Sequence, residues 1–304
     1  MATAILSLPH GVAQLPLYLA GGEAVVQCWQ FGQTIQGRGL HDHLRTQYKP
    51  PSGGRVTSMR ISPCGEQFAS IDENGSVSLW HFGGLQGGPD TTLPFGRLQC
   101  HSRRGADLCF VGSSALLASV GLPAGGANGN EPSLCLWDVL LPPSQALVAS
   151  CRAHQEGGSC IAYSAATSSL TSGGERGDIS IFDLRQRRQR CQWSAHSLAV
   201  KSLAIHEQTS LCFSASADGD LKLWKLDTDF VHEVDARGID GDCHPELSGH
   251  WPHSHEPHTM LHPLPGTALG RTYGINQAVL DGAERLLTAG ADGKVKLWSM
   301  QPGR

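Results

Sequence analysis

A serine, a histidine and an aspartate in this chain have the residue types needed for nucleophilic catalysis. They are His196, Asp218 and one of Ser214 or Ser216. In a Ser/His/Asp hydrolase the histidine takes the proton of the serine hydroxyl, and the aspartate orients the histidine. Such an enzyme also needs an oxyanion hole and an exposed serine on a strained turn, often written G-x-S-x-G. No G-x-S-x-G occurs in the sequence, so we do not expect catalysis by these residues.

A histidine-rich segment is the second candidate for chemistry. It contains His244, His250, His253, His255, His258 and His262. Imidazoles at this density are able to bind Zn²⁺, Ni²⁺ or Cu²⁺. Their spacing matches no structural zinc pattern, and Pro252 and Pro257 oppose a helix that would align the ligands. We therefore expect a polar, composition-biased surface loop, with no metal and no cofactor.

A cluster of arginines is the third candidate. Arg185, Arg187, Arg188 and Arg190 follow one another closely after Asp183. Guanidinium groups at this density attract phosphates or an acidic protein surface. The alternative to such a contact is a solvated loop without a binding role, and it is favoured because arginines are common on exposed turns. We retain the four arginines as the candidate partner contact.

The elements that position these residues are clearest in the stretch Leu211–Leu226, LCFSASADGDLKLWKL. Two apolar runs are joined there by Asp218-Gly219, a dipeptide typical of two-residue β-hairpin turns. Trp224 follows Asp218 by six residues, and His196 precedes Trp224 by 28 residues. An aspartate, a hairpin, a closing tryptophan and an upstream histidine are the parts of one WD-repeat unit.

This reading gives the polar residues a structural role. In a WD repeat a histidine, a serine or threonine, an aspartate and a tryptophan form a buried network that ties the strands of one unit together, and such a network rigidifies a structure when every member is satisfied. We predict a structural tetrad of His196, Ser214, Asp218 and Trp224. The fourth unit is degenerate by the same criteria, because Arg176 stands in the aspartate position and Phe182 in the tryptophan position.

The unit recurs along the whole chain. The closing aromatic residues are Trp29, Trp80, Trp137, Phe182, Trp224 and Trp298. The shortest spacings between them, 42 and 45 residues, match one four-stranded propeller blade each. We predict an all-β fold, a WD-repeat β-propeller with six recognisable blades over residues 1–304. The polar segment 235–273 shows no strand periodicity and is expected to be a flexible, His- and Pro-rich insertion between blades.

The two ends of the chain do not complement each other as expected for a closed propeller. Ile5–Leu8 lies where the inner strand of the first blade should begin, and the chain stops six residues after Trp298. No outer strand is left for the last blade, and open sheet edges are a liability. We therefore expect the chain to be the C-terminal part of a longer one, in which a seventh blade is possible.

Bulk composition excludes several classes of protein. The net charge of −4 argues against a general nucleic-acid binder. No apolar run approaches the length of a transmembrane helix, and the first basic residue, Arg38, comes too late for a secretory signal. The ten cysteines include no C-x-x-C pair, as is typical of reduced core thiols in the cytosol. These features predict a cytoplasmic location without direct membrane insertion.

The ordered set of motifs resembles a known family. The motifs are LTSGGERGDISIFDLRQRRQRCQWSAHSLAVKSLAI, then ASADGDLKLWKL, then LLTAGADGKVKLW. Together they resemble the C-terminal propeller of the DmX-like (rabconnectin) family of very large WD-repeat proteins. The resemblance implies a non-enzymatic scaffold that promotes assembly of the vacuolar-type proton pump, with other proteins as partners.

The same resemblance implies which partners and which location to expect. Pump subunits or their assembly factors are the expected partners, and peripheral association with endomembranes or vesicles is the expected location. The alternative is a WD-repeat adaptor of another pathway, such as a ubiquitin-ligase substrate receptor.

Overall fold

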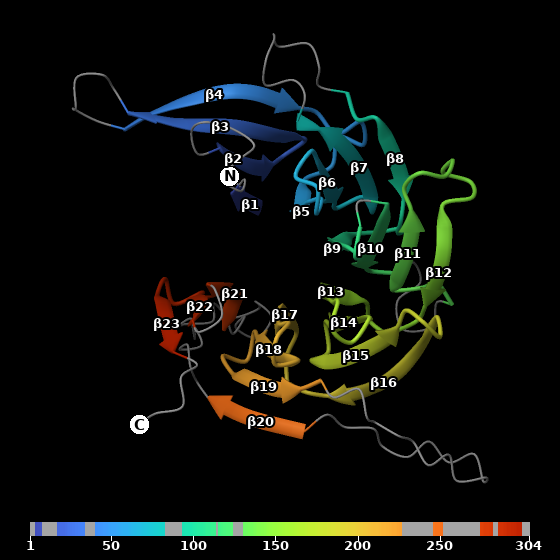
Figure 1. The fold of residues 1–304 in the computed structure, drawn as a ribbon, viewed down its shortest axis with the longest axis vertical. Coiled ribbons are helices and arrows are strands. Elements are labelled where there is room, and N and C mark those ends of the chain that lie inside the picture. The colour runs from blue at the N-terminus through green and yellow to red at the C-terminus, as the bar shows by residue number, and fades with distance from the viewer. Residues whose placement is uncertain are drawn as a thin grey trace, which may run out of the picture. The chain divides into compact units, whose positions relative to one another are not determined.

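The computed structural model describes residues 4–7, 17–33, 40–82, 93–113, 115–123, 130–226, 246–251, 274–281 and 285–299. These residues form strands and turns, and none of them lies in an α-helix. The strands make six antiparallel sheets, which we number as blades one to six in chain order (Figure 1). The chain divides into two compact units, Met1–Arg152 and Ala153–Arg304. The predicted all-β, six-bladed WD-repeat propeller fold is confirmed.

The N-terminal unit contains three four-stranded sheets. Blade one is β1 (Ala4–Ser7), β2 (Leu17–Gly22), β3 (Val25–Gln33) and β4 (Leu40–Tyr48). Blade two is β5 (Val56–Ile61), β6 (Gln67–Asp72), β7 (Ser76–His81) and β8 (Gly96–Gln99). Blade three is β9 (Gly105–Phe110), β10 (Leu116–Gly121), β11 (Leu134–Asp138) and β12 (Leu147–Cys151).

The C-terminal unit contains the other three sheets. Blade four is β13 (Gly158–Ser164), β14 (Ser169–Gly174), β15 (Asp178–Asp183) and β16 (Arg188–Ser194). Blade five is β17 (Val200–His206), β18 (Leu211–Ser216), β19 (Leu221–Lys225) and β20 (Glu246–Trp251). Blade six is three-stranded in the described residues, with β21 (Ile275–Asp281), β22 (Arg285–Gly290) and β23 (Val295–Ser299).

Turn chemistry sets the hairpins that build each blade. In blade five Gly219 has a φ of 90°, and its N–H donates to the carbonyl of Ser216 at 3.2 Å. In blade four Gly177 has a φ of 85°, and a Cβ added there would lie 2.2 Å from the carbonyl oxygen of His196. Glycine is required at these turns because it adopts positive φ at no steric cost and lets another segment approach closely.

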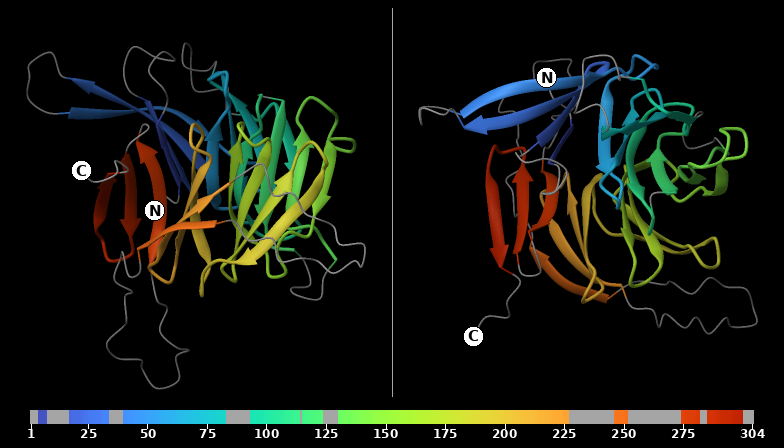
Figure 2. Two further views of the ribbon diagram at one scale, coloured as in Figure 1. Left: turned by 60° about the horizontal axis from the view of Figure 1, so that its bottom comes forward. Right: turned by 45° about the horizontal axis from the view of Figure 1, so that its top comes forward.

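Apolar side chains from neighbouring blades form the core within each unit, and Figure 2 shows the sheets of each unit facing one another. In the C-terminal unit Ile179 and Ile181 of blade four pack with Val200, Cys212 and Trp224 of blade five. Within each unit, neighbouring sheets bury apolar faces against one another, as expected of repeats that cannot form a core alone.

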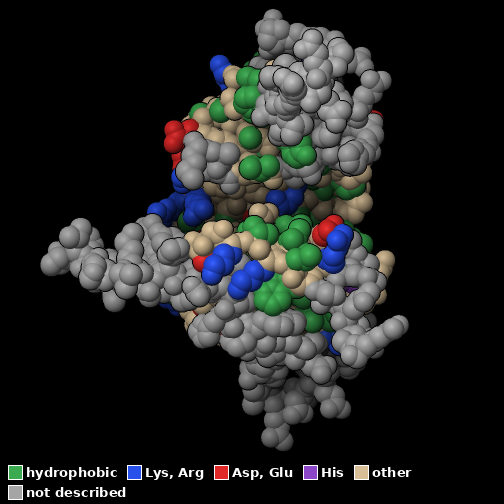
Figure 3. Space-filling model, turned by 90° about the vertical axis from the view of Figure 1, so that its left-hand side faces the viewer, with side chains coloured by type: hydrophobic (Ala, Val, Ile, Leu, Met, Phe, Trp, Pro, Cys, Tyr) green, Lys and Arg blue, Asp and Glu red, His purple; other side chains and the backbone are tan. Residues whose placement is uncertain are grey.

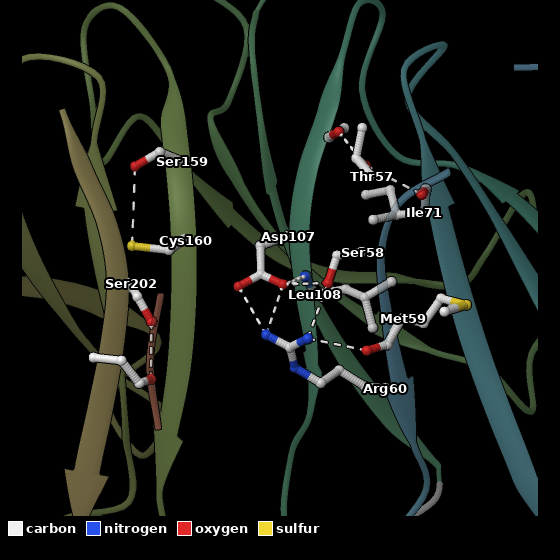
Figure 4. A network of polar contacts seen from close by, with 12 residues as sticks. Thr57, Ser58, Met59, Arg60, Ile71, Asp107, Leu108, Ser159, Cys160 and Ser202 are labelled. Carbon is white, nitrogen blue, oxygen red and sulfur yellow. Dashed lines mark hydrogen bonds and ion pairs between the residues drawn. The ribbon is translucent and has the colours of Figure 1, made fainter. Parts of the chain in front are cut away.

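Hydroxyl groups on the inner strands fasten one blade to the next. Thr57 Oγ1 donates to the carbonyl of Gly105 at 2.7 Å, and Ser202 Oγ donates to the carbonyl of Ala278 at 3.1 Å (Figure 4). Ser159 donates in the same way to the carbonyl of Val200. These bonds satisfy backbone carbonyls at the blade junctions, where an unpaired buried acceptor would be costly.

Blade five differs from the sequence expectation in its outer strand. β20 lies inside the segment 235–273 that was expected to be an insertion without strands, and it pairs with β19. Its sequence, ELSGHW, contains a glycine and no β-branched residue, so it carries little strand signal. An outer strand can still form there, because backbone pairing with β19 does not depend on the side chains. The rest of 235–273 lies outside the described residues.

Candidate functional site

The four residues of the predicted tetrad lie together in blade five. His196 precedes β17, Ser214 lies on β18, Asp218 is in the following turn, and Trp224 lies on β19. His196 Nε2 is 2.7 Å from Ser214 Oγ, and Trp224 Nε1 donates to the same Oγ at 2.8 Å. His196 Nδ1 lies 3.4 Å from Asp218 Oδ2. Ser214 is completely buried, so its hydroxyl is not available to a substrate.

The carboxylate of Asp218 accepts hydrogen bonds from backbone groups around it. Its Oδ2 accepts from the N–H of Ser197 at 3.0 Å, and its Oδ1 accepts from the N–H of Asp220 at 3.0 Å. Burial acts to raise the pKa of Asp218, but the nearby His196 imidazole and the hydrogen bonds from these backbone groups outweigh it, and the pKa lies well below its ordinary value. The carboxylate is therefore a stable anion that fastens the turn to the histidine.

Blade four has a comparable network that the sequence reading missed. His154 Nε2 is 2.8 Å from Ser172 Oγ, and His154 Nδ1 bonds the carboxylate of Asp178. Gln192 also donates to Asp178, at 2.7 Å. Burial acts to raise the pKa of Asp178, but hydrogen bonds and the charge of His154 bring it below its usual value.

The aspartate of blade four comes from a different turn position than expected. Arg176 stands at the position predicted for an aspartate, and its side chain instead pairs with Glu156 in solvent. Asp178 directly follows the turn glycine Gly177, whereas the corresponding aspartate of blade five, Asp218, directly precedes Gly219.

Replacing Asp178 or Asp218 with alanine should lower the free energy of unfolding by about 1–3 kcal/mol, because each change leaves a buried histidine without its carboxylate. Arg176→Ala is the matched control and should change stability little, because exposed ion pairs contribute little. Chemical denaturation measures all three. Equal losses for Arg176→Ala and Asp178→Ala would contradict the assignment of Asp178.

The six closing aromatic residues occupy equivalent register positions on the third strand of their blades. Each pairs with a residue of the second strand: Tyr18 with Trp29, Phe68 with Trp80, Leu117 with Trp137, Leu170 with Phe182, Cys212 with Trp224, and Leu286 with Trp298. Several donate the indole N–H to a second-strand hydroxyl, as Trp80 does to Ser70 at 2.9 Å and Trp298 to Thr288 at 2.9 Å.

The four arginines lie on a turn and the strand that follows it, which we call the basic turn. Arg185 and Arg187 are in the turn between β15 and β16, and Arg188 and Arg190 are on β16. Asp183 Oδ1 orders the turn by accepting from the N–H of Arg185 at 2.8 Å. Arg185, Arg187 and Arg188 are exposed, and Arg190 is half-buried. The turn therefore presents positive charge to solvent on an ordered backbone.

Metal and thiol chemistry find little support in the described part of the chain. No cluster of three or more potential metal ligands occurs among the described residues. Of the predicted histidine-rich loop, His250 lies in β20 and the other histidines lie outside the described residues. Burial raises the pKa of the Cys28 thiol to about 11 and that of Cys212 to about 12, so these thiols stay protonated. No described helix is long and apolar enough to cross a membrane.

Comparison with known sequences identifies both the repeats and a relative. The family described as WD domain, G-beta repeat matches residues 42–81 and 187–225. DmX-like protein 1 of Mus musculus is 33% identical over 217 residues, which cover 70% of this chain and 7% of the relative. DmX-like protein 1 of Homo sapiens is 32% identical over 219 residues, with the same coverage. The chain therefore spans only 7% of the length of these relatives.

Comparison with solved structures supports the fold. Sqt1 of Chaetomium thermophilum, bound to the N-terminus of the ribosomal protein L10, has a TM-score of 0.68 and 16% identity. The match covers 99% of this chain and 72% of that chain. The computationally designed Ika8 protein has a TM-score of 0.61 and 15% identity, with 98% of this chain and 71% of that chain covered. At these identities the likeness concerns the fold alone.

Proposed function

Because this chain is a WD-repeat relative of DmX-like protein 1, we propose that it is a non-enzymatic scaffold that captures subunits of the vacuolar-type proton pump or their assembly factors. The WD repeats and the DmX-like relationship support a protein-interaction role, since WD-repeat propellers generally bind other proteins. The proton-pump part of the proposal rests on the resemblance to the family, because a fold alone does not give a function.

The observation that carries the scaffold proposal is the contrast between the tetrad and the basic turn. In blade five His196 and Ser214 are buried and hydrogen-bonded to each other, and the half-buried Asp218 lies 3.4 Å from the His196 ring. Three of the four arginines of the basic turn are exposed instead. Buried, mutually satisfied groups stabilise a fold, whereas exposed charge on an ordered turn attracts a partner of opposite charge.

The basic turn suits an acidic protein surface. Arginine presents several N–H donors in a planar fork that matches a carboxylate, and it is enriched among the residues that dominate binding energy. Exposed charges mainly speed encounter, and salt screens them over a Debye length of about 10 Å at roughly 0.1 M. Partner capture through this turn should therefore weaken as the salt concentration rises.

Reversing Arg187 and Arg188 to glutamate should reduce capture of pump subunits, and the reduction should be larger at low salt than at high salt. The measurement is affinity capture from a cell lysate with mass spectrometry, repeated with purified pump-sector subunits. The matched control is reversal of Arg103 and Arg104, two adjacent exposed arginines of the N-terminal unit, which should leave capture unchanged.

Two results would count against this proposal. Capture that is insensitive to the Arg187 and Arg188 reversals would place the contact elsewhere on the chain. Capture of a ubiquitin-ligase scaffold in place of any pump component would favour an adaptor of another pathway.

A further inference from the structure

A strongly acidic segment connects the last two strands of blade five, and we call it the acidic connection. It comprises residues 227–245, between Leu226 and β20. Its six acidic residues are Asp227, Asp229, Glu233, Asp235, Asp240 and Asp242, and its one basic residue is Arg237. The rest of the chain holds 22 lysines and arginines and 21 acidic residues, so the net negative charge of the protein comes from this connection.

The acidic connection begins at the end of blade five that corresponds to the basic turn in blade four. Directly after β19, the N–H of Leu226 donates to the carbonyl of Ser210 at 2.7 Å. Directly after β15, the N–H of Leu184 donates to the carbonyl of Ser168 at 3.2 Å. Each acceptor directly precedes the second strand of its blade. The acidic connection and the basic turn therefore start from the same structural position in two successive blades.

Turns of these two blades contact each other at this end. Glu207, in the turn between β17 and β18, accepts from the N–H groups of Ala165 and Ala166 at 3.3 and 3.1 Å. The two alanines share the turn between β13 and β14 with Ser168, whose hydroxyl accepts from Arg185 at 3.2 Å. A continuous series of contacts thus runs from the start of the acidic connection to the basic turn. Both blades belong to the C-terminal unit, so the series lies within one compact unit.

The three exposed arginines of the basic turn form no ion pair with a carboxylate within the described residues. Arg185 donates to Ser168, and Nε of Arg188 donates to Oε1 of Gln186 at 2.6 Å, so both acceptors are neutral. Asp183 is close in sequence, but its Oδ1 accepts from two backbone N–H groups of the turn, at 2.8 and 2.9 Å. The positive charge of the turn is therefore left uncompensated by these residues.

Several other exposed arginines are paired with carboxylates. Arg55 lies 3.5 Å from Glu73, and Arg285 lies 2.9 Å from Asp281. Figure 3, which draws a different side of the molecule, shows basic side chains with acidic ones beside some of them. A cluster of guanidinium groups without such partners attracts carboxylates within its reach, because this pairing is among the stronger polar interactions.

The acidic connection is long enough to reach the basic turn. An extended chain advances about 3.3 Å per residue, so a connection over residues 227–245 that returns to its own blade can extend roughly 30 Å from it. Packed sheets lie about 10 Å apart. The neighbouring blade is therefore well within its reach.

We propose that the acidic connection of blade five binds the basic turn of blade four in the same molecule and competes there with an acidic partner. This inference rests on the proposed function, because it takes the basic turn as the binding site and adds its regulation. The two segments belong to one chain, so a weak attraction between carboxylates and guanidinium groups acts at the high effective concentration of an intramolecular contact. A partner has to displace the connection, and this lowers its apparent affinity.

Carbodiimide crosslinking of the full chain tests the contact directly. This zero-length reagent joins a carboxylate to a lysine amine, so Arg187→Lys places a reactive amine in the basic turn and keeps its charge. We expect a link from position 187 to residues 227–245 within the monomer. The link should be lost at about 1 M salt, where the Debye length is about 3 Å. The matched control is Arg176→Lys, at the other end of β15, which should link to Glu156 and not to the acidic connection.

A binding measurement tests the competition. In one variant the six acidic residues of the connection are replaced by asparagine or glutamine, and the probe is a synthetic oligoglutamate peptide. At low salt this variant should bind the probe about tenfold more tightly than the wild type, as expected where the connection occupies the turn about nine-tenths of the time. Reversal of Arg187 and Arg188 to glutamate should abolish probe binding by both proteins.

Three results would each overturn the proposal. They are the absence of a link from position 187 to the acidic connection, links that form only between two copies of the chain, and equal probe affinity with and without the six carboxylates. Neither measurement contains a pump component, so this inference and the proposed function fail separately. An intramolecular link together with tighter probe binding by the neutralised variant would support the proposal even where no pump subunit is captured.

Discussion

Replacing Trp80 with alanine should lower the free energy of unfolding by about 3–5 kcal/mol, the largest loss we expect from a single substitution in this chain. Trp80 is only 1% exposed. Its ring stacks on Phe68 at a centroid distance of 5.9 Å and meets the edge of Tyr48 at 5.4 Å. Its indole N–H also donates to Ser70 Oγ, which would be left buried and less satisfied.

Denaturant unfolding monitored by circular dichroism measures this loss, and Trp298→Ala is the matched control. Trp298 occupies the same register position in blade six and makes the equivalent bond to Thr288, but it is only half-buried. Trp298→Ala should therefore lower the free energy of unfolding clearly less than Trp80→Ala does. Equal losses at the two positions would show that burial by the neighbouring blade is not what makes Trp80 important.

The comparison between blades two and six also shows what the sequence could predict. The spacing from the turn glycine to the closing aromatic fixes the hairpin register, because one residue of slippage would move every side chain to the other face. Gly75, Gly219 and Gly293 each stand five residues before a closing tryptophan, and the six closing aromatics accordingly share one register position. This part of the fold is encoded locally.

The parts that the sequence did not predict depend on contacts between distant segments. The bond between His154 and Asp178 could not be predicted from the sequence, because an arginine stands at the expected aspartate position and the two residues are brought together by the folded hairpin of blade four. The outer strand β20 is recruited by backbone pairing with β19 across a long intervening segment. The hydrogen bond of the Thr57 hydroxyl could not be predicted from the local sequence either, because its acceptor, the carbonyl of Gly105, belongs to the next blade.

The exposure of two apolar side chains of β23 could not be predicted for a related reason. Val295 and Leu297 are apolar and have the same spacing as Leu221, which is buried, and Leu223, which is half-buried, so periodicity assigns both pairs to a core. Only the exposure of each pair distinguishes them. Apolar patterning alone therefore does not show whether a side chain is buried.

His101 should make the stability of the N-terminal unit depend on pH. The imidazole is only 4% exposed, and its Nε2 lies 3.0 Å from Ser119 Oγ, which also accepts from Trp137 Nε1 at 3.1 Å. No ion pair joins His101 to a carboxylate within the described residues, unlike His154 in blade four. Burial lowers the pKa of His101 from 6.5 to about 4, although the charge of Glu131 acts in the opposite direction.

The direction of the pH effect follows from the two pKa values. Between pH 6.5 and about 4 the unfolded chain binds a proton at His101 that the folded chain does not bind. Stability is therefore complete above pH 6.5 and is lost as the pH falls, by about 2 kcal/mol between roughly pH 7 and 5. Asp178 and Asp218 remain ionised in this window, because their pKa values lie below the ordinary value of 3.8.

Substituting His101 with glutamine should remove this slope, because an amide can still bond Ser119 but does not titrate between pH 7 and 5. Urea unfolding at a series of pH values measures the slope for the wild type and the variant. His81→Gln is the matched control, since His81 is exposed and stacks on Phe95 at 4.1 Å, and it should preserve the slope. If His101→Gln keeps the full slope, the acid sensitivity arises at another histidine and the third blade tolerates protonation of His101.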